Sequence, residues 1–290
     1  MMDGLKLIKT IQSNERYYAY EAEFDGKKVF AKKAKMAKTK ELISGIPKNS
    51  ATVNDLGSKT TDFSFRAPKI LATENGWLVT EWIEGESIGT IMDKDPKTVA
   101  STLARFFVIF DDEPVRPEGF RIIFTTKGLA SRMQERLPEN LEHGQKSVLE
   151  DAKKLFDELR PSLEPSLQDA DIKPDHIFRD PKKPGAYVLI DSEHLSSQWP
   201  RFYDLGNNFA KFWVQNRKDF SNTLTRTFIH KSGIASDIIF HSLVAILIVR
   251  GISMHWETDY DPGAEIYNIP RAQAMLKVIL DARNLEDLLY

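Results

Sequence analysis

The chain contains the segment Asp171-Ile172-Lys173-Pro174-Asp175-His176-Ile177-Phe178, followed further along by Leu189-Ile190-Asp191. Between the two, the residues from Pro181 to Gly185 are typical of a turn and are flanked by apolar runs. The pattern therefore predicts a β-hairpin over residues 177–190. Because a hairpin returns the chain to the end where it began, we expect Asp191 to lie near the segment that starts at Asp171.

Composition limits the class of protein. The chain has 290 residues, of which 41% are hydrophobic and 28% charged, with a formal net charge of −2. These values predict a soluble globular protein with a full core. Acidic and basic residues are interspersed, so no nucleic-acid partner is expected. The absence of cysteine excludes disulfides and thiolate chemistry, and the first residues do not resemble a secretory signal, so we expect a cytoplasmic location.

The most apolar run spans residues 238–254. A helix that is apolar on all sides is typical either of a membrane span or of a central core helix. This run is slightly short for a bilayer and carries His241 and Arg250. We therefore expect a helix buried among other helices, and no membrane partner.

The periodicity of the sequence changes near Gly85. Before it, alternating patterns predict five strands, at 5–8, 17–24, 28–32, 69–72 and 77–82. Residues 36–62 are helix-like, with a predicted break at Gly45 to Pro47 and a second short helix capped by Asn49 or Ser50. After Gly85, helical periodicity predicts seven helices, at 97–110, 127–137, 145–160, 205–217, 220–231, 236–254 and 270–288. The expected fold class is α+β, with a sheet-rich domain at 1–85 and a mainly helical domain at 86–290.

Five motifs occur in a fixed order: Val29-Phe30-Ala31-Lys32, Val79 to Gly85, Asp169 to Phe178, Ile190-Asp191-Ser192-Glu193, and Tyr203-Asp204-Leu205-Gly206. Their order and spacing resemble the protein-kinase-like superfamily, and within it the branch of aminoglycoside and choline-kinase-like small-molecule phosphotransferases. The resemblance covers residues 13 to 206. It implies a bilobal protein-kinase-like fold, with a small antiparallel-sheet lobe that binds nucleotide and a larger helical lobe that carries the catalytic loop and the acceptor site.

The resemblance implies a set of nucleotide-binding residues in the first domain. Lys32 is expected to contact the phosphates, and Phe30, on the same face of its strand, to cover the base. The hinge presents backbone groups to the base, and a phosphate-covering loop lies between the first two strands. These further residues are Glu81, Trp82 and Ile83 in the hinge, and Ser13 and Asn14 in the loop.

The resemblance also implies the residues of the chemistry. Asp171 is expected to orient the acceptor hydroxyl, and Lys173 to neutralise charge on the transferred phosphoryl group. Asp191 is expected to bind magnesium, with His176 at the position of the family's second metal ligand. Asp204 either caps the helix that starts at Leu205 or anchors the catalytic loop.

The resemblance also implies an acid on the helix after Lys32 that pairs with that lysine. Glu41 and Asp55 both qualify by position, and the sequence does not choose between them. Taken singly, each is better interpreted as an ordinary exposed acid. Glu41 and Asp55, like Asp204, are expected to support the site rather than to contact the substrates.

Three departures from the family pattern leave an alternative open. Asp169 replaces a histidine, and its carboxylate is expected to lie near that of Asp171, which raises the proton affinity of one of the two. His176 replaces an asparagine, which favours manganese over magnesium or weakens metal binding. The loop that covers the phosphates lacks glycine. A nucleotide-binding protein without catalytic activity, a pseudokinase, is therefore the second hypothesis.

The acceptor is expected to be a small molecule. Only twelve residues separate Asp191 from Asp204, which is too few for the activation segment that a protein kinase uses to bind a peptide. The acidic residues Glu257, Asp259, Asp261 and Glu265 have two interpretations, a group that attracts a cationic acceptor and a solvated acidic loop, and the solvated loop is preferred. The predicted function is thus a metal-dependent transfer of the terminal phosphoryl group of ATP or GTP to a hydroxyl of a small molecule.

Overall fold

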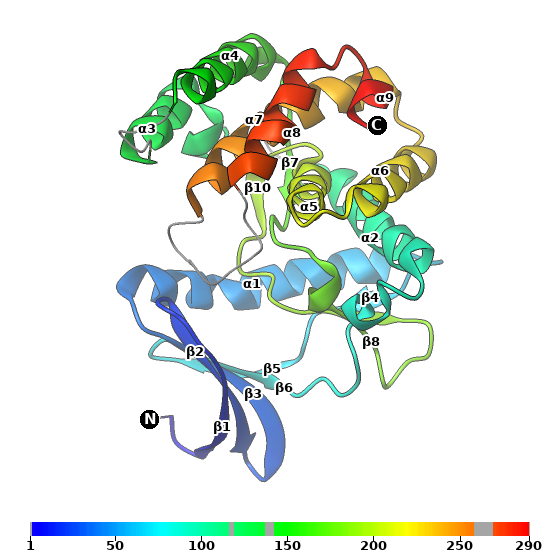
Figure 1. Ribbon diagram of the computed structural model, residues 1–290. Helices are drawn as coiled ribbons and strands as arrows, with labels where there is room; N and C mark the ends of the chain where they lie inside the picture. The colour runs from blue at the N-terminus through cyan, green and yellow to red at the C-terminus, as the bar shows by residue number, and fades with distance from the viewer. Residues whose placement is uncertain (1, 116–118, 137–141, 258–268, 290) are drawn as a thin grey trace. The chain divides into compact units, whose positions relative to one another are not determined.

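A computed structural model describes residues 2–115, 119–136, 142–257 and 269–289 (Figure 1). They form two compact units. The first comprises Met1–Asp93 and Lys173–Leu195, and the second Lys94–Ile172 and Ser196–Tyr290. By its contacts, the segment Lys173–Leu195 thus belongs with the N-terminal sheet. The predicted domain boundary between residues 85 and 86 stays a prediction.

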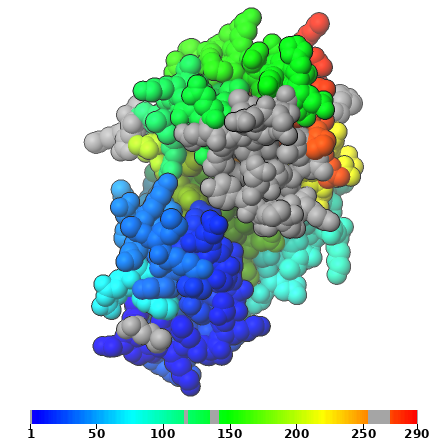
Figure 2. Space-filling view, turned by 60° about the vertical axis from the view of Figure 1, so that its left-hand side comes forward, coloured from blue at the N-terminus to red at the C-terminus, as the bar shows by residue number. Residues whose placement is uncertain are grey.

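The first unit is built on a five-stranded antiparallel sheet in the order β1-β2-β3-β6-β5. Asp25 and Gly26 form the turn between β2 and β3 with φ values of 50° and 72°, as a tight hairpin requires. In the space-filling view, β1 to β3 (dark blue) and α1 (lighter blue) form one surface of this unit (Figure 2). The predicted strands are confirmed, as β1 (Leu5–Ser13), β2 (Tyr17–Phe24), β3 (Lys27–Ala34), β5 (Ile70–Glu74) and β6 (Trp77–Glu81).

The helix α1 (Ala37–Lys59) runs without interruption for 23 residues. The predicted break at Gly45 to Pro47, and with it the second helix start at Asn49 or Ser50, is wrong. Proline inside a helix costs about 3 kcal/mol, because it removes one hydrogen bond and crowds the preceding turn. Ile43 and Ile46, which precede Pro47 along the helix, pack on Ala34 and Leu78 of the sheet. Burial of each such side chain contributes about 1.5–3 kcal/mol, which offsets that cost.

A smaller sheet holds the predicted hairpin. Strand β8 (Ile177–Arg179) pairs antiparallel with β9 (Tyr187–Leu189), which confirms the hairpin. On its other side, β9 pairs in parallel with β4 (Phe65–Arg66). The short 3₁₀ helix η4 (Pro174–His176) leads into β8, and η1 (Ile88–Ile91) follows the hinge. Pairing with β4 therefore fixes the hairpin within the first unit.

The second unit is mainly helical. The predicted helix over 270–288 is divided into α8 (Ile269–Asp281) and α9 (Leu285–Leu288), because the Asn284 side chain accepts a hydrogen bond from Asp287 N and starts a new helix. Two short strands that the sequence pattern did not predict, β7 (Pro165–Gln168) and β10 (Ser196–Pro200), pair antiparallel. The other predicted helices are confirmed, as α2 (Pro96–Asp111), α3 (Thr126–Arg136), α4 (His143–Leu159), α5 (Tyr203–Val214), α6 (Lys218–Ser232) and α7 (Ser236–Glu257).

Helix α7 forms the centre of this unit. Its residues from Leu243 to Ile248 are all buried, and it packs on α4, α5 and α8. A Cβ atom built on Gly206 of α5 meets Ile246 Cγ2 at 2.6 Å, so α5 and α7 approach as closely as glycine allows. This confirms the expected core helix. No helix within the described parts of the chain is long and apolar enough to cross a membrane.

Candidate functional site

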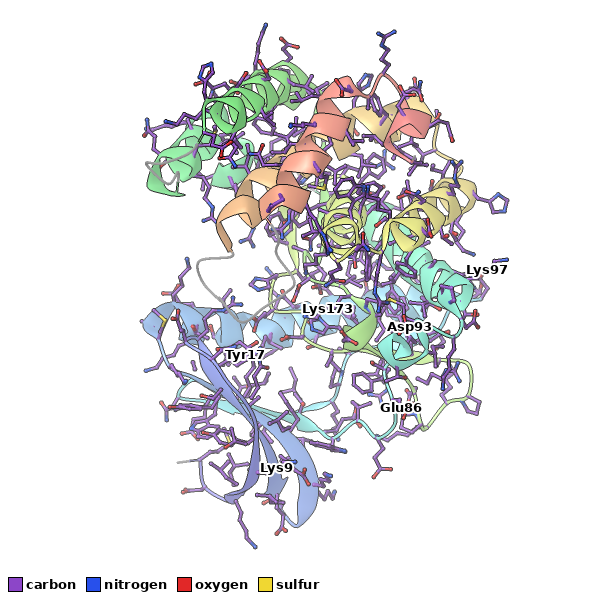
Figure 3. All side chains as sticks on the ribbon, in the orientation of Figure 1. Lys9, Tyr17, Glu86, Asp93, Lys97 and Lys173 are labelled. Carbon is purple, nitrogen blue, oxygen red and sulfur yellow. The ribbon has the colours of Figure 1, made fainter. Side chains whose placement is uncertain are left out.

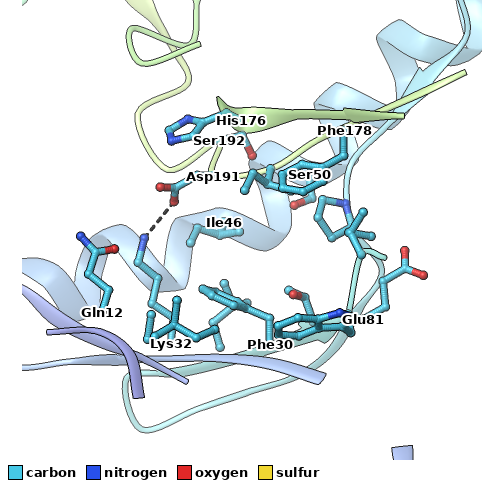
Figure 4. Close-up of a pocket in the computed structure, with 18 of the residues that line it drawn as sticks. Gln12, Phe30, Lys32, Ile46, Ser50, Glu81, His176, Phe178, Asp191 and Ser192 are labelled. Atoms are coloured by element: carbon cyan, nitrogen blue, oxygen red, sulfur yellow. Dashed lines mark hydrogen bonds and ion pairs between the residues drawn. The ribbon is translucent and has the colours of Figure 1, made fainter. Parts of the chain in front are cut away.

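The first unit contains a cavity of about 400 Å³, a size typical of small-ligand sites. Figure 4 shows Phe30 and Lys32 on the side of the sheet, with His176, Phe178 and Asp191 on the opposite side. Most of the lining is apolar, with a few polar groups. The apolar residues include Phe30, Ile46, Leu78, Trp82, Ile83, Phe178 and Ile190, and the polar ones include Gln12, Lys32, Ser50, Thr80, Glu81, His176 and Asp191.

Lys32 is the buried cation of this cavity, with only 3% of its surface exposed. Its Nζ lies 2.8 Å from Asp191 Oδ1 and 2.6 Å from Glu193 Oε2. It also lies 3.9 Å from the centre of the Tyr17 ring. Burial alone lowers the pKa of a lysine, but the two carboxylates and Tyr17 outweigh that effect and raise the pKa of Lys32 above its usual value. Lys32 is therefore a permanently charged group inside a mostly apolar cavity.

Neither Glu41 nor Asp55 of α1 pairs with Lys32, and both are exposed, as the interpretation of each as an ordinary surface acid predicts. Asp55 pairs with Lys59 at 2.8 Å, and Glu41 lies on the exposed side of the helix. Next to Ser50, which lines the cavity, Asn49 Nδ2 of α1 donates to the Ser192 carbonyl at 2.7 Å. The helix thus holds the chain segment that carries Asp191 and Glu193 and leaves the pairing with Lys32 to that segment.

Asp191 and His176, the two predicted metal ligands, line the same wall of the cavity. Ile190 N donates to the His176 carbonyl at 2.9 Å, which holds the two chain segments together. Asp191 has a φ of 62°, in the left-handed region that residues other than glycine rarely adopt. Such a conformation costs roughly 1 kcal/mol or more and is concentrated at functional positions. The fold thus holds Asp191 in a strained geometry.

Asp191 and His176 fit a metal ion that is already bound to phosphates. Across residues 2–115, 119–136, 142–257 and 269–289, no group of three or more His, Asp or Glu residues could hold a metal by itself. Asp191 and His176 offer one carboxylate and one imidazole. Magnesium at nucleotide sites is bound by one or two carboxylates, and phosphate oxygens and water complete its shell. Asp191 and His176 therefore supply enough ligands for a metal ion only when phosphate oxygens supply others.

The hinge residue Glu81 is tied into an ionic network. Its carboxylate pairs with Arg66 and Lys182 and accepts a hydrogen bond from Lys69 N at 2.9 Å. Arg66 Nε also donates to Asp180 Oδ2 at 2.6 Å. Burial opposes ionisation of Glu81, but its donors hold its pKa below the usual range, and Arg66 does the same for Asp180. The Glu81 side chain thus fixes the hinge to β4 and to the hairpin.

The predicted phosphate loop lies at the turn between β1 and β2. Asn14 Oδ1 accepts hydrogen bonds from the backbone N–H of Arg16 and of Tyr17, both at 2.9 Å, so its side chain closes the turn. Ser13 Oγ accepts from Lys35 Nζ at 3.0 Å. From this part of the chain, Ile11, Gln12 and Tyr17 line the cavity, and Gln12 is labelled at its wall in Figure 4. The assignment of Ser13 and Asn14 to phosphate binding stays a prediction.

Asp171, the candidate catalytic residue, belongs to the second unit. Its Oδ1 lies 2.8 Å from Nζ of Lys211 on α5, and the two side chains are 29% and 17% exposed respectively. Ala170, the residue before it, has a φ of 70°. As at Asp191, an unusual backbone conformation therefore accompanies the candidate carboxylate.

The first turns of α5 hold the loop that carries Asp171. Asn207 Nδ2 donates to the Ala170 carbonyl at 2.9 Å, and Asn208 Nδ2 donates to the Ile172 carbonyl at 2.7 Å. Both asparagines are buried. The carbonyls on either side of Asp171 are therefore fixed by side chains of one helix.

Asp204 anchors the same loop and is fully buried. Its Oδ2 accepts a hydrogen bond from Asp169 N at 2.9 Å. Burial raises the pKa of Asp204 to about 7, although the backbone N–H groups of Asp169 and Ala170 oppose the shift. Since the N-cap of α5 is Phe202, the contact supports the loop anchor over the plain helix cap.

Lys173 and Asp169 lie on either side of Asp171 in the sequence. Lys173 directly precedes η4 in the first unit (Figure 3). Asp169 is 1% exposed, in contrast to Asp171. The catalytic role of Lys173 stays a prediction, and the acidic residues Asp259, Asp261 and Glu265 lie outside the described residues.

Four residues of the two clusters were not predicted: Glu193, Asn207, Asn208 and Lys211. The last three could have been found, because they share one face of α5 with Asp204 at spacings of three, four and seven residues. Glu193 follows Asp191 by two positions, but nothing in the local pattern marks it as the partner of a lysine far away in the sequence.

No known protein-family profile matches the sequence, and no curated protein matches it either. Solved structures do match. The chain is similar to the aminoglycoside phosphotransferase APH(4)-Ia, with a TM-score of 0.64 and 12% identity over 96% of this chain and 94% of that one. A choline/ethanolamine kinase family protein from Mesorhizobium loti matches with a TM-score of 0.62 and 12% identity over 98% and 90% of the two chains. An ethanolamine kinase from Plasmodium vivax matches with a TM-score of 0.61 and 13% identity over 96% and 82%. The chain therefore has the α+β fold of the protein-kinase-like phosphotransferases, as predicted.

Proposed function

We propose that the protein is a metal-dependent phosphotransferase that moves the terminal phosphoryl group of ATP or GTP to a hydroxyl of a small molecule. The observation that carries the proposal is the buried Lys32, which is paired with Asp191 inside an apolar cavity of about 400 Å³. An apolar slot suits a nucleobase, and a fixed lysine beside a carboxylate suits phosphates and their metal ion.

Each residue has a role in this proposal. Phe30, Trp82 and Ile83 contact the base, and Lys32 contacts the phosphates. Asp191 and His176 would hold magnesium or manganese, which would supply positive charge to neutralise the phosphates. Asp171 takes the proton of the acceptor hydroxyl as its oxygen bonds to the terminal phosphorus. The bond from that phosphorus to the bridging oxygen breaks, and the nucleoside diphosphate leaves.

Similar structures support a nucleotide and a small acceptor. One structure of a thermostable APH(4)-Ia mutant is a ternary complex with ADP and hygromycin B, and it matches this chain with a TM-score of 0.65 and 10% identity. The ethanolamine kinase and the choline/ethanolamine kinase family protein share the same fold. By analogy of fold, we propose a nucleotide and a small hydroxyl compound as the substrates of this chain. We place the reaction in the cytoplasm, which suits a chain without cysteine.

One contact favours the second candidate function, a nucleotide-binding protein without catalytic activity. Asp171 is bound to Lys211, which weakens a carboxylate as a base. A thermal-shift titration with ATP, with and without magnesium or manganese, separates the two. The phosphotransferase is stabilised by nucleotide only when the metal is present, whereas the pseudokinase is stabilised equally without it.

Turnover is tested with Asp171→Asn. We expect transfer of the terminal phosphoryl group from ATP, including the slow transfer to water, to fall at least about a hundredfold, while nucleotide affinity is unchanged. The same variant of a pseudokinase shows no change in either quantity. Asp175→Asn is the matched control, because it removes a carboxylate from an exposed position of the same segment.

A further inference from the structure

Three residues form a row across neighbouring strands of the sheet beside the cavity. Gln12 of β1 pairs with Ala19 of β2, and Ala19 pairs with Lys32 of β3. Residues directly opposite each other on neighbouring strands point to the same face of a sheet. All three line the cavity, and Figure 4 shows Gln12 and Lys32 extending into it from the side of the sheet. Gln12 and Lys32 therefore flank Ala19 on the cavity wall.

A β-bulge brings Gln12 into this row. Thr10 and Gln12 lie opposite two consecutive residues of β2, which leaves Ile11 as an extra residue in β1. Consecutive residues of a regular strand point to opposite faces, yet Ile11 and Gln12 both line the cavity. Bulges re-aim side chains in this way and are frequent next to active sites. The irregularity of β1 thus directs Gln12 toward the cavity.

The small residue at the centre of the row leaves room above it for a ligand. The side chain of Ala19 is a single methyl group, whereas Gln12 and Lys32 have long side chains. Neighbouring strands lie about 4.8 Å apart, so the Cα atoms of Gln12 and Lys32 are separated by about 10 Å. Gln12 is exposed to solvent, so its amide is accessible to a ligand that enters the cavity. An anion above Ala19 can therefore contact the amide on one side and the ammonium on the other.

The turn that follows this strand uses its polar groups internally. Asn14 Oδ1 accepts hydrogen bonds from the backbone N–H groups of Arg16 and Tyr17, and Asn14 N donates to the Tyr17 carbonyl at 3.1 Å. Lys35 Nζ donates to Ser13 Oγ and to the Asn14 carbonyl. In glycine-rich phosphate loops, backbone N–H groups donate to phosphates instead. The closed turn therefore favours a phosphate contact from a side chain of this part of the chain.

Lys32 alone is a weak attractor for a phosphate group. Two carboxylate oxygens, from Asp191 and Glu193, lie within 2.8 Å of its Nζ. A phosphate that approaches Lys32 thus meets two negative charges together with one positive charge. A primary amide donates a hydrogen bond without bringing a further charge into the cavity. Gln12 supplies such a donor on the side of Ala19 away from Lys32.

We infer that the Gln12 side-chain amide donates a hydrogen bond to a phosphate group of the nucleotide, which lies above Ala19 between Gln12 and Lys32. The inference rests on the proposed function and deepens it by assigning a further phosphate-binding residue. It moves the phosphate contact of this part of the chain from Ser13 and Asn14 to the strand before them. The Gln12 side chain thereby replaces the backbone donors of a glycine-rich loop, which the sequence lacks between residues 12 and 16.

Calorimetric titration in the presence of manganese tests the inference. One ligand is whichever of the non-hydrolysable ATP and GTP analogues binds wild type more tightly, and the other is the nucleoside with the same base. In Gln12→Leu, we expect the affinity for the analogue to fall at least about tenfold, because a hydrogen bond to a charged group is lost. The affinity for the nucleoside changes by less than about twofold, since it has no phosphate.

Two charged variants give a second readout that a purely structural role of Gln12 does not produce. Gln12→Glu places a negative charge beside the phosphates, so it weakens binding of the analogue more than Gln12→Leu does. Gln12→Lys restores a donor and adds a positive charge, so its affinity for the analogue is at least that of wild type. The expected order of affinity for the analogue is therefore lysine, glutamine, leucine and glutamate at position 12.

Thr10→Val is the matched control, because Thr10 is an exposed residue of the same strand that does not line the cavity. It is expected to change neither affinity, and thermal melting verifies that each variant is folded. Equal losses for analogue and nucleoside in Gln12→Leu overturn the inference, as does an unchanged affinity for the analogue. Equal affinities of Gln12→Glu and Gln12→Lys for the analogue also overturn it, whether or not the nucleoside binds measurably. These outcomes leave the proposed function intact, whereas no binding of either analogue by wild type overturns the proposed function itself.

Discussion

Lys32 Nζ lies 2.6 Å from Glu193 Oε2, closer than its 2.8 Å contact with Asp191, and both side chains of the shorter pair are almost completely buried. Glu193 follows Asp191 by two residues, so one short segment supplies both partners of the lysine. This has a consequence for ligand binding: if Asp191 turns to a metal ion, Glu193 can still hold Lys32 in place. In the proposed function, the pair would separate positioning of the lysine from coordination of the metal.

Glu193→Gln tests this division of roles. The variant leaves Lys32 with one carboxylate, so we expect the free energy of unfolding to fall by about 2 kcal/mol. The affinity for a metal–nucleotide complex falls about tenfold, because Asp191 must then serve both the lysine and the metal. Urea unfolding and calorimetric titration measure the two effects.

Glu41→Gln is the control for that variant, since Glu41 is an exposed residue of α1. It is expected to change stability by less than about 0.5 kcal/mol. If Glu193→Gln behaves like this control in both measurements, Glu193 has no positioning role.

Asp204→Asn is expected to change how stability depends on pH. The pKa of Asp204 is raised from 3.8 to about 7 in the folded protein. Between these values the folded state binds the extra proton, so the contribution of Asp204 to stability falls as pH rises. The variant lacks this loss, and its stability relative to wild type increases from pH 4 to pH 7 by up to about 1.4 kcal/mol per pH unit. A pH-independent difference in urea unfolding contradicts the prediction.

Arg66→Met is expected to destabilise the first unit by about 2 kcal/mol at pH 7, because it leaves the partly buried carboxylates of Glu81 and Asp180 without their arginine. Both carboxylates have pKa values below their usual range, so this stabilisation is present above about pH 4 and lost as pH falls through the folded-state pKa values. The difference from wild type in urea unfolding therefore shrinks at pH 3. Arg226→Met, which breaks an exposed pair with Glu286, costs less than about 1 kcal/mol.

Two glycines of α1 make a matched pair for the packing of this helix. Nothing lies within 4 Å of a Cβ atom built on Gly45, so Gly45→Ala stabilises the protein by about 0.5–1 kcal/mol. On Gly57 the same atom meets the Phe65 carbonyl oxygen at 2.0 Å, so Gly57→Ala forces the helix away from β4 and costs about 3 kcal/mol. Thermal unfolding measures the change in stability of each variant, which is expected to be positive for Gly45→Ala and negative for Gly57→Ala. Similar changes in the two variants contradict this packing of α1 on β4.

The sequence predicted the order of elements better than the contacts between them. Alternating residues in β2, β3 and β6 and helical periodicity after Gly85 are local signals, and they were sufficient for the fold class. The break predicted in α1 was wrong because the propensity of Pro47 is local, whereas the burial of Ile43 and Ile46 against the sheet is a tertiary effect.

The candidate site was predicted in part for the same reason. Lys32 and Asp191 were identified from motifs, and the structure brings them together at 2.8 Å. The acid that pairs with Lys32 was left open between Glu41 and Asp55 of α1, since the resemblance suggested that helix, but the partners are Asp191 and Glu193. Lys211 was missed, although it shares one face of α5 with Asp204, because a lysine on a helix is usually solvated; the packing of α5 on the loop places it against Asp171.

Calorimetric titration with a non-hydrolysable ATP analogue and manganese tests the central claim most directly, that the cavity around Lys32 and Asp191 binds a metal–nucleotide complex. We expect wild type to bind one analogue per chain, with affinity that falls when manganese is omitted. Lys32→Met and Asp191→Asn each weaken binding at least about tenfold, and in Asp191→Asn the dependence on manganese is lost. No binding by wild type in the presence of manganese, or the same affinity in all three proteins, contradicts the claim.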